Sequence, residues 1–230
     1  MDLHAGEAAP ETSLPMVGAL SAAAIAAIVV IPLAGLIGRA TARWSGPDPI
    51  VRLMGSAVYG ALVGLAVGAA LLVSQRNRAG QHHDGQPSAR VACSLLAPSA
   101  AGAVAATFIG FAGEALNAQT TSPTGLGLYL LGSMVLGAAV AGAARLRGPS
   151  NAFCAALLGG ALGGFVVWLV ANGLRGSVVS PTTFACWAGL AADPAGGPNL
   201  LRDAVGAALP AVCIPLGIGV MDAARMVWRR

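Results

Sequence analysis

Two apolar stretches carry small residues at every fourth position: Ser56–Ser74, SAVYGALVGLAVGAALLVS, and Ala152–Ala171, AFCAALLGGALGGFVVWLVA. Residues four apart lie on the same face of an α-helix. Three rows of small residues follow from this spacing: Gly60, Gly64 and Gly68; Gly159 and Gly163; and Ala156, Gly160 and Gly164. Such rows let helix backbones approach closely within a lipid bilayer. Both stretches are therefore predicted to be central packing helices of a membrane protein.

The composition points to the same class. Of the 230 residues, 56% are hydrophobic and 10% are charged, and the mean hydropathy is +0.74. Soluble domains carry about 25% charged residues. A water-soluble fold of this composition would expose large apolar patches, whereas lipid can solvate them. The sequence predicts an all-α, polytopic integral membrane protein.

Hydropathy predicts about six transmembrane helices, because one span needs about 20 apolar residues. The expected spans are residues 16–38, 54–74, 91–113, 125–144, 152–171 and 204–224. They form one domain, 16–230, after a polar tail, 1–15. The long connection 172–199 is expected to lie at the membrane surface or to re-enter the membrane. Six spans place both termini on the same side.

Arginine placement predicts the orientation. The chain has a net charge of +4, and all its basic residues other than histidine are arginines. The side of the termini would hold Arg76, Arg78, Arg90, Arg145, Arg147, Arg225, Arg229 and Arg230, against Arg39, Arg43, Arg52, Arg175 and Arg202 opposite. By the positive-inside rule the termini are expected in the cytoplasm. The abundance of Ala, Gly and Arg is typical of a GC-rich bacterial genome, so we expect a bacterial inner membrane.

The two halves of the chain share spaced residues. Gly35, Arg43 and Gly46-Pro47 match Gly137, Arg145 and Gly148-Pro149, and Arg90 and Pro98 match Arg202 and Pro210. These matches predict repeats over 16–116 and 125–230. A unit of three spans crosses the membrane an odd number of times, so the second copy would be inverted. Chance matching in a chain rich in Ala and Gly is the other interpretation.

Inverted repeats are common in transporters, whose ligand path lies near the bilayer midplane beside interrupted helices. The candidate path residues are Pro98 and Pro210, which interrupt spans, and the polar residues Ser99, Glu114 and Asn117. Glu114 has two interpretations: a group on an ion path, or an ordinary carboxylate at the membrane edge. Asp222 and Arg225 are three residues apart and are expected to pair locally.

Other chemistries lack a motif. His82, His83 and Asp84 are adjacent in a loop and do not have metal-ligand spacing, and the four cysteines stand singly. No histidine lies in a span to activate a serine or cysteine nucleophile, and no dense basic run indicates nucleic-acid binding. We therefore predict no catalytic residues, no metal, no cofactor and no enzymatic activity.

Two functions fit these observations. The first is a transporter, permease or channel-like protein for a small solute or ion. The second is a non-catalytic structural or accessory subunit of a larger membrane complex, whose small-residue faces pack on partners. Besides the bilayer, the predicted partners are other copies of the chain or other membrane subunits, bound through those faces.

Overall fold

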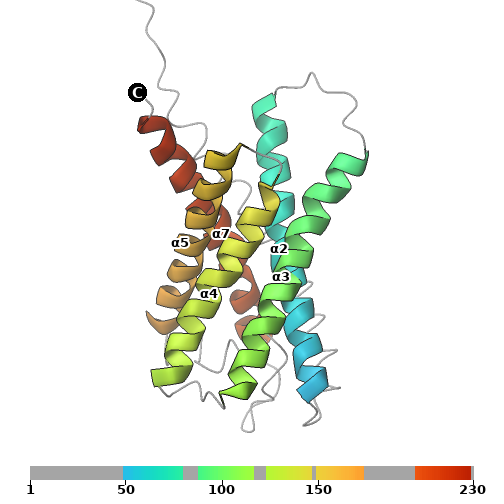
Figure 1. Cartoon of the computed structure of the whole chain (residues 1–230), viewed down its shortest axis with the longest axis vertical. Helices are drawn as coiled ribbons and strands as arrows, with labels where there is room; N and C mark the ends of the chain where they lie inside the picture. Colours follow the sequence, from blue (N-terminus) through green and yellow to red (C-terminus); the bar gives the residue numbers. More distant parts are fainter. Residues whose placement is uncertain (1–48, 80–87, 117–122, 147–148, 174–199, 229–230) are drawn as a thin grey trace, which may run out of the picture.

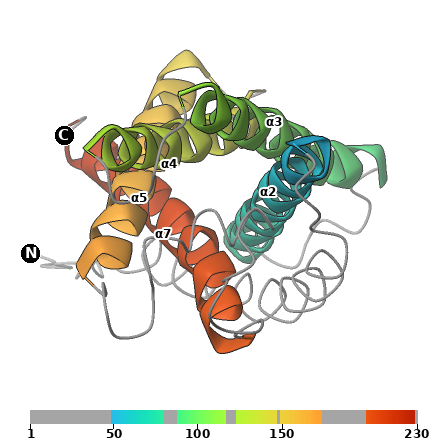
Figure 2. The ribbon, with the colours of Figure 1, turned by 90° about the horizontal axis from the view of Figure 1, so that it is seen from below.

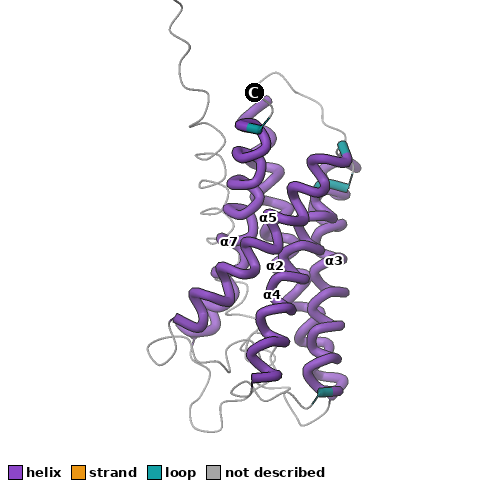
Figure 3. The backbone as a smooth tube through the Cα atoms, turned by 60° about the vertical axis from the view of Figure 1, so that its left-hand side comes forward, coloured by secondary structure: helices purple, strands orange, loops and turns teal. Residues whose placement is uncertain are grey.

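A computed structural model describes residues 49–79, 88–116, 123–146, 149–173 and 200–228 of the chain. These residues form the helices α2 (Pro49–Ala79), α3 (Ser88–Ala115), α4 (Pro123–Ala144), α5 (Ser150–Gly173) and α7 (Leu200–Val227). Within the described ranges there is no strand (Figure 3). The all-α prediction is therefore confirmed for this part of the chain.

Each of the last five predicted spans lies inside one of these helices. The helices extend past the predicted apolar spans by two to five residues at most ends. Helices α2 and α4 begin at Pro49 and Pro123. The first position of a helix suits proline, because a backbone N–H there would have no partner within the helix. Four segments are long and apolar enough to cross a membrane: Ser56–Val73, Val91–Gly113, Leu126–Ala144 and Ser150–Val170. The predicted span 16–38 and the tail 1–15 lie outside the described residues, so a total of six spans remains a prediction.

Successive helices run in opposite directions (Figure 1). We call the end where α2, α4 and α7 finish the upper end, as drawn there. Seen along the bundle, α2, α3, α4, α5 and α7 follow one another around a ring, and α7 returns to contact α2 (Figure 2). The centre of the ring is filled mainly by side chains of α2, α4 and α7, among them Tyr59, Val63, Val67, Leu136, Val140, Ile214 and Ile218.

The glycine row of α2 lies directly on the backbone of α3. A Cβ atom added to Gly60 would collide with the carbonyl oxygen of Gly102, and one added to Gly64 would collide with that of Pro98. At Gly68 the added atom would lie 2.7 Å from the carbonyl oxygen of Ser94. Any larger residue in this row would force the two helices apart.

Helix α5 uses its two rows against two different helices. Gly160 and Gly164 lie against α4, where their added Cβ atoms would collide with the carbonyl oxygens of Gly137 and Ser133. Gly159 lies against Gly217 of α7, and an atom added to Gly163 would lie 2.6 Å from the Cα atom of Ile214. The adjacent rows thus let α5 pack closely on both neighbours.

Large apolar side chains cover the outer faces of the bundle. Phe108 and Phe111 of α3 are 70% and 61% exposed, and Leu131 of α4 and Leu158 of α5 are exposed to a similar degree. A soluble protein rarely exposes contiguous apolar surface of this kind. The outer surface is therefore suited to contact with lipid, while the small residues face other helices.

One ion pair joins the upper ends of α4 and α7. Arg145 Nη2 lies 2.9 Å from Asp222 Oδ2, and the two residues are 77 positions apart in the chain. The expectation that Asp222 pairs with Arg225 is therefore wrong. The ring places the end of α4 beside the last turns of α7. The spacing of residues within one helix does not predict this contact between two helices.

Candidate functional site

A small cavity lies where four helices meet inside the bundle. Its lining comes from α2, α4, α5 and α7, with the residues Tyr59, Ser133, Leu136, Gly164, Val167, Pro210 and Ile214. It leaves about 10 Å³ for the centre of a water molecule, which is close to the smallest space that holds one water. None of the seven lining residues is charged. Its lining is therefore uncharged and mostly apolar, and only two of its side chains carry a polar atom.

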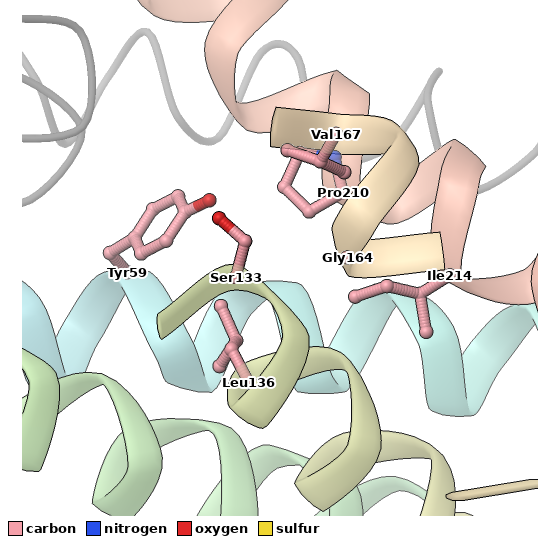
Figure 4. Close-up of a pocket in the computed structure, with 7 residues that line it drawn as sticks. All are labelled: Tyr59, Ser133, Leu136, Gly164, Val167, Pro210 and Ile214. Atoms are coloured by element: carbon pink, nitrogen blue, oxygen red, sulfur yellow. The ribbon is translucent and has the colours of Figure 1, made fainter. Parts of the chain in front are cut away.

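Two hydroxyl groups provide the polar part of this lining. The side chains of Tyr59 and Ser133 extend from α2 and α4, and their oxygen atoms point toward one another (Figure 4). Both residues are buried, at 6% and 5% exposure. The Oγ atom of Ser133 has no hydrogen-bond partner among the described residues. Leaving a buried hydroxyl unsatisfied costs about 1–3 kcal/mol. A polar molecule bound in the cavity would remove this cost by forming a hydrogen bond with Ser133.

Close helix packing positions Ser133. The backbone carbonyl of Ser133 lies against Gly164 of α5, where a larger residue would collide with it. Val167, one turn further along α5, adds an apolar wall and is 2% exposed. The glycine row of α5 thus fixes the depth at which the Ser133 hydroxyl enters the cavity.

Pro210 lies inside α7 at the same place. Proline lacks an N–H, so it cannot bond to the carbonyl four residues earlier in the helix, and its ring disturbs that turn. Pro215 repeats the interruption one and a half turns later. Helix α7 is therefore less constrained by its own hydrogen bonds beside the cavity than an uninterrupted helix would be.

No family model, curated protein or solved structure matches the chain.

The predicted path residues that the structure describes lie in different parts of the bundle. Pro210 lines the cavity, whereas Ser99 lies between α2 and α3 and donates a hydrogen bond to the carbonyl oxygen of Ala61 at 2.9 Å. Pro98 is buried against Gly64 in the same interface. Glu114 belongs to the last turn of α3, and Asn117 lies outside the described residues. Of the four path residues that the structure describes, Pro210 lies at the cavity.

Tyr59 and Ser133 were not among the predicted site residues. Each is a single hydroxyl in a long apolar span. Serine and threonine hydroxyls in helices often bond to a carbonyl of their own helix, as Thr107 does to that of Ala103 at 2.7 Å, and an isolated tyrosine does not by itself indicate a site. No local pattern pairs positions 59 and 133. Among the described residues, no group of three His, Cys, Asp or Glu side chains could hold a metal ion.

Proposed function

We propose that the protein is a transporter or channel-like permease for a small, uncharged, polar solute, with the four-helix cavity as its binding position. The observation that carries this proposal is the pair of buried hydroxyls, Tyr59 and Ser133, which face one another between packed helices. Polar groups within spans are costly and mark ligand paths in many membrane proteins. At about 10 Å³ the cavity has room for no more than one water molecule, so passage of a larger solute would require the helices to move apart.

The lining supports an uncharged solute. A charged guest would need a counter-charge inside the bundle, and the seven lining residues supply none. Hydroxyl groups can both donate and accept hydrogen bonds. They therefore match solutes such as water, ammonia, urea or a small polyol better than an ion.

The packing supports an arrangement in inverted halves. Helices α2 and α3 cross where Gly60 meets Gly102, and α5 and α7 cross where Gly159 meets Gly217. One turn along, Gly64 lies on the backbone at Pro98 and Gly163 lies on the backbone at Cys213. Since α2 and α5 run in opposite directions (Figure 1), the two pairs fit an inverted relation, with the cavity between them.

The same packing weakens the alternative of an accessory subunit. That hypothesis rests on small-residue faces that are open to partner proteins. The rows at Gly60, Gly159 and Gly160 lie against helices of the same chain, and the outer faces carry large apolar side chains instead. Purification in mild detergent would test it, because a stoichiometric partner subunit would favour the alternative.

We further propose that the upper end faces the cytoplasm of a bacterial cell. The described helices carry Arg76, Arg78, Arg90, Arg145 and Arg225 toward that end, and Arg52 and Arg202 toward the other. This distribution supports a cytoplasmic upper end by the positive-inside rule. The termini follow on the same side if residues 16–38 also cross the membrane.

Flux measurements on the purified protein in liposomes test the transport proposal. Stopped-flow shrinkage under gradients of glycerol, urea and other small neutral solutes should exceed that of empty liposomes for at least one solute. Ser133→Ala and Tyr59→Phe each remove one hydroxyl and should lower this flux about fivefold, since one hydrogen bond contributes about 1 kcal/mol. Thr107→Val is the matched control, because the Thr107 hydroxyl donates a hydrogen bond to a carbonyl of its own helix. Absence of flux for every solute, or equal loss in the control, would contradict the proposal.

A further inference from the structure

We propose that the Arg145–Asp222 ion pair is a latch at the upper end of the bundle, which opens when Asp222 exchanges Arg145 for Arg225 on its own helix. The inference rests on the proposed transport function and describes how access to the cavity is regulated. Three features of α4 and α7 support it: the ion pair itself, the buried Arg225 nitrogen that lacks a hydrogen-bond partner in the described part of the chain, and the residues between the ion pair and the cavity.

The ion pair is a direct polar link between helices that otherwise make few contacts with each other. Arg145 follows the last turn of α4, where its backbone N–H bonds to the carbonyl oxygen of Gly142. Its guanidinium and the Asp222 carboxylate are 23% and 16% exposed. The pair is thus half-buried, and such pairs are screened less by salt than fully exposed ones.

Arg225 lies one turn beyond Asp222 on α7. Its Nη1 atom is buried and has no hydrogen-bond partner within the described helices and turns. Arg225 as a whole is only partly buried, and a buried donor atom without a partner is unfavourable. Residues three apart on a helix are neighbours, so the Asp222 carboxylate is within the reach of Arg225 once it leaves Arg145.

Two arginines therefore compete for one carboxylate. Asp222 keeps a partner in both arrangements, while one arginine is released in each. Released Arg145 would lie at the C-terminal end of α4, where the helix dipole favours a positive charge. Because both arrangements contain one Asp–Arg pair, they form a two-state element that a bound solute can shift.

The latch and the cavity are connected along the same two helices. On α7, Ile214 lines the cavity and Ile218 follows one turn later, before Asp222. On α4, Leu136 lines the cavity and Val140 precedes Arg145. Ile218 and Val140 are almost fully buried and fill the interior between the cavity and the ion pair. Pro215 interrupts α7 in this segment and permits a bend there.

Chemical access to the cavity tests the latch. The reporter is Ser133→Cys in the full chain with Cys93, Cys154, Cys186 and Cys213 replaced by alanine. A membrane-impermeant thiol reagent is added from the side of the upper end, and the rate of modification is measured in membrane vesicles. Leu146→Cys, at an exposed position at the same end, calibrates delivery of the reagent.

Breaking the ion pair should raise the modification rate of the introduced thiol. We expect Arg145→Gln to raise the rate at least about fivefold, the lower end of typical coupling between linked states. Asp222→Asn removes the ion pair from both arrangements, so it should raise the rate less than Arg145→Gln does. Arg145→Asp combined with Asp222→Arg keeps an ion pair between α4 and α7 but provides no carboxylate for Arg225, so the rate should stay at or below that of the parent. Arg225→Gln should lower the rate below the parent, because the open state then loses its ion pair.

An unchanged rate in Arg145→Gln, with normal labelling of Leu146→Cys, would overturn the latch. A rate increase in Arg225→Gln would overturn the exchange, because it would indicate general loosening instead. Elution as a single species in size-exclusion chromatography is required of every variant, and the charge reversal provides a second measurement if one single variant fails to fold. Since the readout is access and not flux, failure of the latch and failure of transport are distinguishable.

Discussion

Single glycines set how closely the helices of this protein approach. At Gly64 an added Cβ would collide with the carbonyl oxygen of Pro98 and lie 2.7 Å from the Cα atom of Ser99. These neighbours are backbone atoms, which cannot rotate away as the end of a flexible side chain can. In lipid, van der Waals packing at such contacts replaces the hydrophobic effect that holds helices together in water.

Gly64→Ala should therefore destabilise the protein, by about 1–3 kcal/mol as for other overpacked interiors. Gly127→Ala is the matched control, since an atom added at Gly127 meets nothing within 4 Å. It should leave stability unchanged or raise it by up to about 1 kcal/mol, because alanine favours helix more than glycine does. Thermal unfolding of the purified variants in detergent measures both effects. Equal stability of the two variants would contradict the close packing of α2 on α3.

At the scale of one element, α5 packs on two sides through adjacent rows. Gly159 and Gly163 lie on α7, and Gly160 and Gly164 lie on α4. Adjacent positions on a helix are about 100° apart around its axis, so rows offset by one residue face in different directions. The contact of α5 with α7 and its contact with α4 should therefore be separable by substitution.

Cys213 offers a natural reporter for this separation. It is partly exposed, and its backbone lies against Gly163. In a chain with Cys93, Cys154 and Cys186 replaced by alanine, Gly163→Ala should push α7 away from α5. The rate of modification of Cys213 by a permeant maleimide should then rise about fivefold, as expected for about 1 kcal/mol of strain.

Gly160→Ala is the matched control for this measurement. Its added atom would lie 2.6 Å from the Cβ atom of Ala141 on α4 and would not press on α7. The Cys213 rate should remain near that of the parent. A similar increase in both variants would show that the two rows do not act on separate neighbours.

At the scale of the whole molecule, the alternation of the helices divides their ends between two sides. Leu146 follows α4 and Trp228 follows α7 at the upper end, whereas Leu116 follows α3 at the opposite end. All three are exposed, Trp228 at 92%. In a membrane protein these ends lie near opposite surfaces of the bilayer.

Labelling with an impermeant maleimide tests this arrangement. In intact cells and in inverted vesicles, single cysteines introduced as Leu146→Cys and Trp228→Cys should react from one side, and Leu116→Cys should react from the other. The physical reason is that a span of about 30 Å of hydrocarbon separates the two sets of positions. Reaction of Leu146→Cys and Leu116→Cys from the same side would contradict a bundle that crosses the membrane.

The sequence by itself determined the class of the protein and the course of its helices. Apolar runs of bilayer length predict where α2, α3, α4, α5 and α7 lie, because hydropathy and helix length are local properties of the chain. The four-residue spacing also marked the faces that lie against other helices, such as the row at Gly60.

Only the tertiary structure decided which helix each face meets and which polar groups come together. Small residues have no side-chain chemistry that selects a partner, so nothing at Gly159 or Gly160 distinguishes α7 from α4. Asp222 bonds to Arg145 and not to nearby Arg225, and Tyr59 meets Ser133 across 74 positions of sequence (Figure 4). Such pairings follow from the packing of the whole bundle, because separation in space is set by the ring of helices and not by distance along the chain.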